Sequence, residues 1–86
     1  MNSTNELFTL KNKTIVLTGS AGRLGTRFAH VLSKSGANVV LVDIEKSKNK
    51  KLEKELIDQY ETNPTAFYAD ISNQNNVKDL IKKIKL

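Results

Sequence analysis

Short apolar runs alternate along the chain with longer stretches in which apolar residues recur every three or four positions. The runs at 13–18, 39–42 and 66–69 are typical of buried strands in a parallel sheet. Each run is followed by a pattern that predicts an amphipathic helix. The expected apolar stripes of these helices are Leu24, Phe28, Val31 and Leu32, then Leu52, Leu56, Ile57 and Tyr60, and then Val77, Leu80, Ile81 and Ile84. This alternation predicts an α/β fold whose parallel strands are joined by right-handed crossovers.

Residues with particular backbone preferences mark the expected helix boundaries. Gly36 is expected to end the first helix, because glycine tolerates the left-handed backbone found there. Asn63 and Pro64 are expected to end the second helix, because the residue before proline is pushed out of helical geometry. Ser72 is the predicted N-cap of the third helix.

A glycine-rich turn joins the first predicted strand to its helix. Residues 18–25 read Thr-Gly-Ser-Ala-Gly-Arg-Leu-Gly, with glycines spaced G-x-x-G-x-x-G. In a strand–turn–helix unit, Gly19 permits the tight turn, Gly22 lets the backbone approach a pyrophosphate, and Gly25 allows close helix packing. The free amides and positive end of the helix favour the negative phosphates. The alternative is a turn that serves helix packing alone.

An aspartate follows each of the other two strands. The carboxylate of Asp43 could accept both hydroxyls of an adenosine ribose, and it would repel a ribose 2′-phosphate, so it favours NAD over NADP. Arg23 and Lys46 could oppose this preference by reaching the 2′-phosphate. Asp70 could accept a hydrogen bond from the adenine amine. The alternatives are a turn residue or N-cap for Asp43, and a turn acid before Ser72 for Asp70.

Composition and charge narrow the class of protein. The chain has 86 residues, a net charge of +5 and no cysteine, which excludes disulfides and thiolate metal sites and makes the cytoplasm the expected location. No apolar run approaches the roughly 20 residues of a membrane span. The basic run at 46–51 could be a nucleic-acid patch, but its interleaved acids and lack of aromatics favour a solvated helix start. We therefore expect no nucleic-acid or membrane partner.

These motifs together resemble the short-chain dehydrogenase/reductase family. The resemblance runs through the segments at 8–13, 18–25, 37–43 and 70–72. It implies a Rossmann-like, three-layer parallel sheet truncated to about three strands, with a leader at 1–12 and a partial NAD(P)-binding domain at 13–86. The cofactor contacts that we expect are Gly19, Ser20, Gly22, Arg23, Leu24, Gly25, Asp43, Asp70 and Ile71.

The chain departs from the family pattern in two ways. The commonest spacing would place a glycine at 23, where Arg23 stands; the variant with Gly22 resembles extended members and some enzymes of sugar or surface-polysaccharide modification. The family's catalytic serine and Tyr-x-x-x-Lys pair are also absent, so the chain is expected to be inactive alone. It would then be the N-terminal portion of an oxidoreductase, associating through an exposed sheet edge or with a missing C-terminal half. The alternatives are a stand-alone nucleotide-binding module without enzymatic activity and a basic nucleic-acid-binding domain, which Asp43 disfavours.

Overall fold

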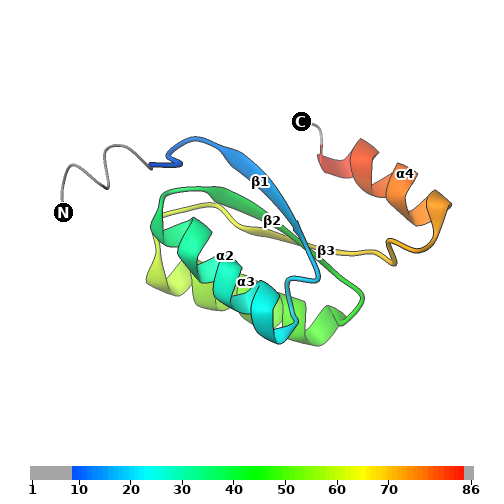
Figure 1. Cartoon of the computed structure of the whole chain (residues 1–86), viewed down its shortest axis with the longest axis horizontal. Helices are drawn as coiled ribbons and strands as arrows, with labels where there is room; N and C mark the ends of the chain where they lie inside the picture. Colours follow the sequence, from blue (N-terminus) through cyan, green and yellow to red (C-terminus); the bar gives the residue numbers. More distant parts are fainter. Residues whose placement is uncertain (1–8, 85–86) are drawn as a thin grey trace.

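The computed structural model describes residues 9–84, which form three strands and three helices (Figure 1). In chain order these are β1 (Thr14–Thr18), α2 (Arg23–Lys34), β2 (Asn38–Asp43), α3 (Lys46–Gln59), β3 (Thr65–Tyr68) and α4 (Gln74–Ile84). Most of the predicted leader at 1–12 lies outside the described residues. Its last four residues lead into β1 through a turn, and Leu10 packs against the core.

The three strands form one parallel sheet in the order β1-β2-β3. Leu17 of β1 lies opposite Leu41 of β2, and Asp43 of β2 lies opposite Tyr68 of β3. The predicted alternation of strands and helices and the Rossmann-like α/β fold are therefore confirmed. β1 begins one residue later than predicted, although the carbonyl of Lys13 still accepts a hydrogen bond from the amide of Asn38 at 2.8 Å.

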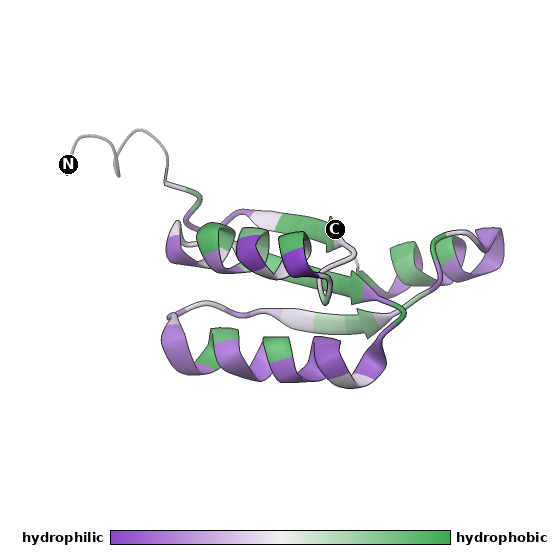
Figure 2. Ribbon diagram, turned by 60° about the horizontal axis from the view of Figure 1, so that its bottom comes forward, coloured by the Kyte–Doolittle hydropathy of each residue, from purple (hydrophilic) through white to green (hydrophobic). Residues whose placement is uncertain are grey.

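The helices cover the two faces of the sheet unequally. α2 and α3 pack on one face around a core of Ala29, Ala37, Val39, Leu41, Leu52 and Leu56. On the other face, α4 brings Leu80 and Ile84 against Val40, Val42 and Ala69. Figure 2 shows that the strands are the most hydrophobic elements, whereas α3 is largely hydrophilic. The carboxyl ends of all three strands meet at one edge of this three-layer arrangement.

The predicted apolar stripe of the first helix is wrong for three of its four residues. Leu24, Phe28 and Val31 are 63%, 49% and 60% exposed. The side of α2 that lies on the sheet instead carries Ala29 and Ser33, whose small side chains allow close approach. At helical spacing the exposed stripe lies roughly opposite Ala29 and Ser33, so it faces away from the sheet. In the other two stripes, Ile57 and Ile81 are likewise exposed.

The predicted N-cap of the third helix is also wrong. Asn73 caps α4, because its side-chain oxygen accepts hydrogen bonds from the amides of Asn75 at 2.9 Å and Asn76 at 3.2 Å. The hydroxyl of Ser72 donates instead to the carboxylate of Asp70 at 2.6 Å. The helix consequently begins one residue later than a Ser72 cap would require.

Candidate functional site

The glycine loop, residues 19–25, leaves the end of β1 and enters α2. Gly19 has a φ of +68°, in the left-handed region that favours glycine, and its amide donates to the carbonyl of Val42 at 2.8 Å. A Cβ at Gly25 would lie 2.1 Å from the carbonyl oxygen of Gly19, so only glycine fits there. At Gly22 a Cβ would meet only that same oxygen, at 3.3 Å, and the residue is exposed. Gly25 therefore serves the fold, whereas the space beside Gly22 is open to a ligand.

The first turn of α2 presents backbone donors to this space. Within the described chain, no hydrogen-bond acceptor is found for the amides of Arg23, Leu24 and Gly25, which we call the first-turn amides. The turn contains no acidic residue, and Arg23 is exposed at its start. Free amides, the helix dipole and a guanidinium together make this end of α2 attractive to an anion.

Asp43 connects the end of β2 to the glycine loop. Its Oδ2 accepts a hydrogen bond from the amide of Ala21 at 2.8 Å, and its Oδ1 accepts one from the amide of Glu45 at 2.7 Å. The side chain is largely buried. Each carboxylate oxygen can accept a second hydrogen bond, so the loop contact leaves acceptor capacity for a ligand hydroxyl.

A hollow of about 210 Å³ opens at the carboxyl ends of the strands. We call it the carboxyl-edge hollow; its lining is Gly19, Val42, Asp43, Ile44, Ala69, Asp70 and Ile71. It brings together four of the nine predicted contacts. Val42 and Ala69 are buried, whereas Ile44 and Ile71 are more than half exposed. Apolar walls with carboxylates close by suit a flat heterocycle that carries polar edges.

Asp70 is held as a carboxylate by its own turn. Its Oδ1 accepts hydrogen bonds from the hydroxyl of Ser72 at 2.6 Å and from the Ser72 amide at 3.0 Å. The Ser72 hydroxyl first, and then the Ser72 amide, lower the pKa of Asp70 below its ordinary value. The second oxygen has no partner among the residues that the structure describes, so it can accept from a ligand donor.

Ser20 and Asn49 form a buried pair behind the glycine loop. The Ser20 hydroxyl donates to Oδ1 of Asn49, and both residues are almost fully buried. Asn49 and Ile44 are not among the site residues that the sequence predicts. Asn49 stands three and seven residues before Leu52 and Leu56, so helical periodicity already places it on the buried side of α3. Ile44 could have been found as the apolar residue directly after Asp43.

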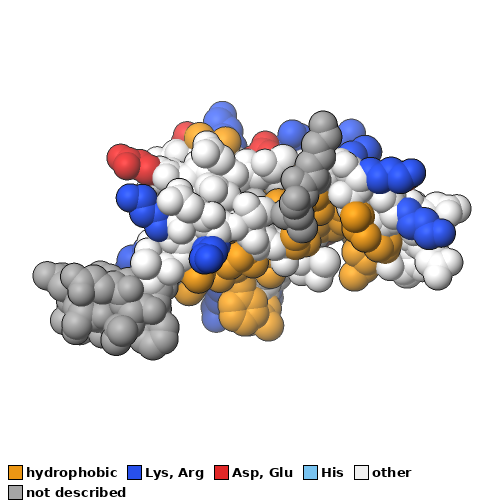
Figure 3. Space-filling model, turned by 90° about the horizontal axis from the view of Figure 1, so that it is seen from above, with side chains coloured by type: hydrophobic (Ala, Val, Ile, Leu, Met, Phe, Trp, Pro, Cys, Tyr) orange, Lys and Arg blue, Asp and Glu red, His pale blue; other side chains and the backbone are white. Residues whose placement is uncertain are grey.

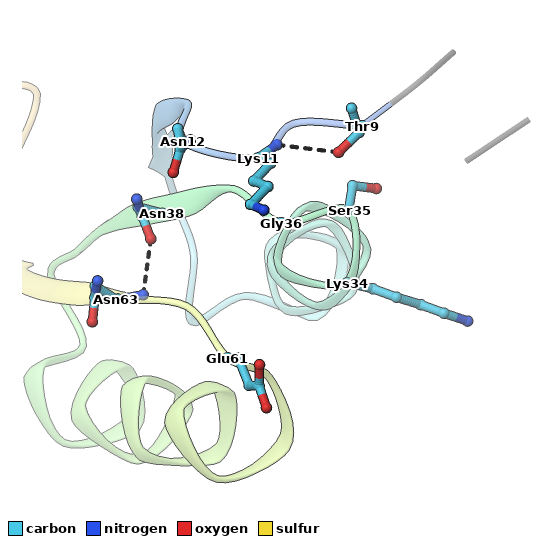
Figure 4. Close-up of a pocket in the computed structure, with 9 residues that line it drawn as sticks. All are labelled: Thr9, Lys11, Asn12, Lys34, Ser35, Gly36, Asn38, Glu61 and Asn63. Atoms are coloured by element: carbon cyan, nitrogen blue, oxygen red, sulfur yellow. Dashed lines mark hydrogen bonds between the residues drawn. The ribbon is translucent and has the colours of Figure 1, made fainter. Parts of the chain in front are cut away.

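A larger hollow, of about 380 Å³, lies at the opposite ends of the strands (Figure 4). Its side chains do not converge on one point. Lys34 extends away from the hollow, and the side-chain oxygen of Asn38 accepts the amide of Asn63 at 2.9 Å within the fold. Because the glycine loop and both aspartates lie at the other edge, the carboxyl-edge hollow is the better candidate site.

The described part of the chain shows neither a metal-ligand cluster nor a membrane-spanning helix. Among residues 9–84, no cluster of three or more histidine, cysteine, aspartate or glutamate side chains is placed to hold a metal ion. None of the helices in that range has the length and hydropathy to cross a membrane.

A parallel sheet with a glycine loop at its carboxyl edge and an acid at the end of the next strand defines the Rossmann class of dinucleotide-binding folds. The family profile of the short chain dehydrogenases matches residues 13–86. The chain belongs to this family of NAD(P)-binding oxidoreductases.

Individual relatives agree with this assignment. The chain is 37% identical over 79 residues to the uncharacterized oxidoreductase YxbG of Bacillus subtilis, covering 88% of this chain and 28% of that one. It is 32% identical over 76 residues to 15-hydroxyprostaglandin dehydrogenase [NAD(+)] of Bos taurus, covering 87% and 29%. A citronellol catabolism dehydrogenase of Pseudomonas aeruginosa superposes with a TM-score of 0.82 at 31% identity, covering 86% and 30%. The chain thus spans less than a third of the length of these relatives.

Proposed function

We propose that residues 13–86 bind the adenosine and pyrophosphate of a nicotinamide dinucleotide, with NAD preferred, as the N-terminal part of a short-chain oxidoreductase. The observation that carries the proposal is the carboxyl-edge hollow, where Gly19, Asp43, Asp70 and Ile71 meet beside the first-turn amides. The nicotinamide of the cofactor would supply hydride chemistry.

Each part of the cofactor has a matching group. The first-turn amides and the open space at Gly22 suit the pyrophosphate, with the guanidinium of Arg23 nearby. Asp43 suits the ribose hydroxyls. The free oxygen of Asp70 suits the adenine amine, and Ile44 and Ile71 would flank the ring. Ser20 contributes through the shape of the loop rather than by direct contact, because its hydroxyl is already bound to Asn49.

The preference for NAD rests on charge repulsion. A ribose 2′-phosphate about 5 Å from the Asp43 carboxylate would be repelled by about 3 kcal/mol per pair of unit charges at an effective dielectric near 20. Arg23 and Lys46 are both exposed, and either side chain would reduce this penalty if it reached the 2′-phosphate. We also propose a cytoplasmic location, which the absence of cysteine from the 86 residues supports.

Calorimetric titration with NAD and NADP tests the proposal. We expect wild-type affinity for NAD to exceed that for NADP by at least about tenfold. Asp43→Asn removes the charge and should lower the NAD-to-NADP affinity ratio severalfold. Asp58→Asn, an exposed position on α3, is the matched control and should leave the ratio unchanged. Tighter binding of NADP by the wild type would overturn the role given to Asp43.

We further propose that the 86-residue chain alone turns over no substrate, and that it is part of an enzyme of the sugar or surface-polysaccharide modification type. The first proposal is supported by the lack of the family's serine and Tyr-x-x-x-Lys pair in this sequence, and the second by a glycine at 22 instead of 23. The nicotinamide absorbance band, followed with a panel of sugars and alcohols, tests the first. Cofactor-dependent turnover by the pure chain would refute it.

A further inference from the structure

Ser20 is bound on three sides by elements that surround the glycine loop. Its amide donates to the carbonyl of Val42 in β2 at 3.3 Å. Its carbonyl accepts the hydroxyl of Thr26 in α2 at 3.1 Å. Its own hydroxyl donates to Asn49 in α3. Within residues 19–25, Ser20 alone is fully buried, so it is the point at which the otherwise accessible loop is fixed to the fold.

Asn49 uses its whole side-chain amide in this contact. Its Nδ2 donates to the carbonyl of Leu41 at 2.9 Å and to that of Phe67 at 3.3 Å, and its Oδ1 accepts from Ser20. The residue is 1% exposed. One asparagine thus joins β2, β3 and the glycine loop, and no water or other group is needed to satisfy it.

We propose that Asn49 is a positioning residue that acts through Ser20 to hold the glycine loop ready for a pyrophosphate. The proposal rests on the function proposed above. The loop carries three glycines, and flexible glycine backbone loses much conformational entropy when a ligand orders it. A loop that the Ser20–Asn49 pair already holds loses less entropy on binding, which raises affinity for the phosphates without contacting them.

The pair should act on phosphates more than on adenosine. Ser20 directly precedes Ala21 and Gly22, which lead into the first-turn amides. The walls of the carboxyl-edge hollow come mostly from the end of β2 and from the residues that follow β2 and β3. Loss of the Ser20 hydroxyl is therefore expected to loosen the phosphate-facing amides and to leave the adenosine-facing walls in place.

The test compares ADP-ribose, which carries the pyrophosphate, with adenosine, which lacks it. Both are titrated by NMR chemical shifts into wild type and Ser20→Ala. We expect Ser20→Ala to weaken ADP-ribose about tenfold, the equivalent of about 1.4 kcal/mol, and to change adenosine less than twofold. Ser33→Ala is the matched control, since Ser33 is another buried serine of the chain whose hydroxyl has no partner among the described residues. It should leave both affinities unchanged.

The ratio of the two affinities remains informative if a variant is partly unfolded, because an unfolded fraction weakens both ligands equally. Asn49→Ala should produce the same change in this ratio as Ser20→Ala, and the double variant should add little, because the two residues act as one unit. An unchanged affinity ratio, which includes equal weakening of both ligands, would overturn the positioning role. Additive effects of the two single substitutions would overturn it as well. A wild type that binds neither ligand would instead overturn the proposed function itself.

Discussion

β1 and β2 are neighbouring parallel strands of similar composition with very different surroundings. Five of the six residues of β2 are buried, whereas none of the five residues of β1 is. β2 lies between two strands and has helices over both faces, while β1 has a neighbour on one side only within the described range. Position in the sheet, and not hydropathy, therefore decides how fully each of the two strands is buried.

The same difference extends to the helix that follows β1. The stripe of α2 made of Leu24, Phe28 and Val31 is exposed, and Val16 of β1 is 39% exposed. Figure 3 looks onto the edge that carries β1 and shows hydrophobic side chains gathered beside β1 and α4. Exposed apolar side chains that gather at a sheet edge are typical of a surface that another polypeptide segment covers.

The largest expected effect comes from truncating the two leucines that lie opposite each other in these strands. Leu41 is fully buried and Leu17 is half-buried, and both contribute to the core under α2 and α3. We expect Leu41→Ala to lower the free energy of unfolding by roughly 2 to 5 kcal/mol, and Leu17→Ala by about half as much. Urea denaturation measures both. Equal losses would show that β1 is covered in solution as fully as β2.

The sequence was sufficient for the architecture because the alternation of patterns is a local property. It could not tell which side of α2 the fold would cover. Leu24, Phe28 and Val31 share one side at helical spacing, but so do Ala29 and Ser33, and the small pair is the one that lies on the sheet. Hydrophobic periodicity identifies a stripe; whether a neighbour covers it depends on tertiary structure.

The candidate site could also be predicted in part, because the local pattern of strands already shows which residues stand at the strand ends. Asp43 ends β2, Gly19 and Asp70 come just after β1 and β3, and parallel strands bring their carboxyl ends to one edge of the sheet. The sequence does not reveal the role of Asn49, because the residue lies in a basic run that favours a solvated helix start, although its own side chain faces inward. A contact between residues 20 and 49 depends on how α3 returns across the sheet, which no local pattern encodes.

A smaller effect is expected at the β1 edge itself. We expect the wild-type chain to self-associate through this edge. Val16→Lys places a charge on the strand, and charges on edge strands oppose pairing between chains. The dissociation constant for self-association should rise roughly tenfold, the equivalent of about 1.4 kcal/mol.

Sedimentation equilibrium measures this dissociation constant. Ile57→Lys on α3 is the control, since Ile57 is also exposed but lies away from the β1 edge. A monomeric wild type, or equal effects of the two substitutions, would contradict association through β1.

The smallest expected effect concerns the aspartates near the carboxyl ends of β2 and β3, which are held by different hydrogen bonds. Asp43 receives amides from two separate segments, whereas the carboxylate of Asp70 is bonded only to Ser72 among the described residues. Ser72→Ala removes the larger cause of the lowered pKa of Asp70, so that pKa should rise toward its ordinary value. A carboxyl whose pKa is lower in the folded than in the unfolded chain adds stability above the unfolded pKa and loses it as the pH falls through the folded pKa. The advantage in stability of the wild type over Ser72→Ala should therefore be present at neutral pH and disappear in acid.

Carboxyl-carbon NMR titration measures the Asp70 pKa directly, and Ser47→Ala, which changes an exposed serine on α3, should leave that pKa unchanged. An identical pKa of Asp70 in wild type and Ser72→Ala would show that the hydroxyl contact does not hold the carboxylate in solution.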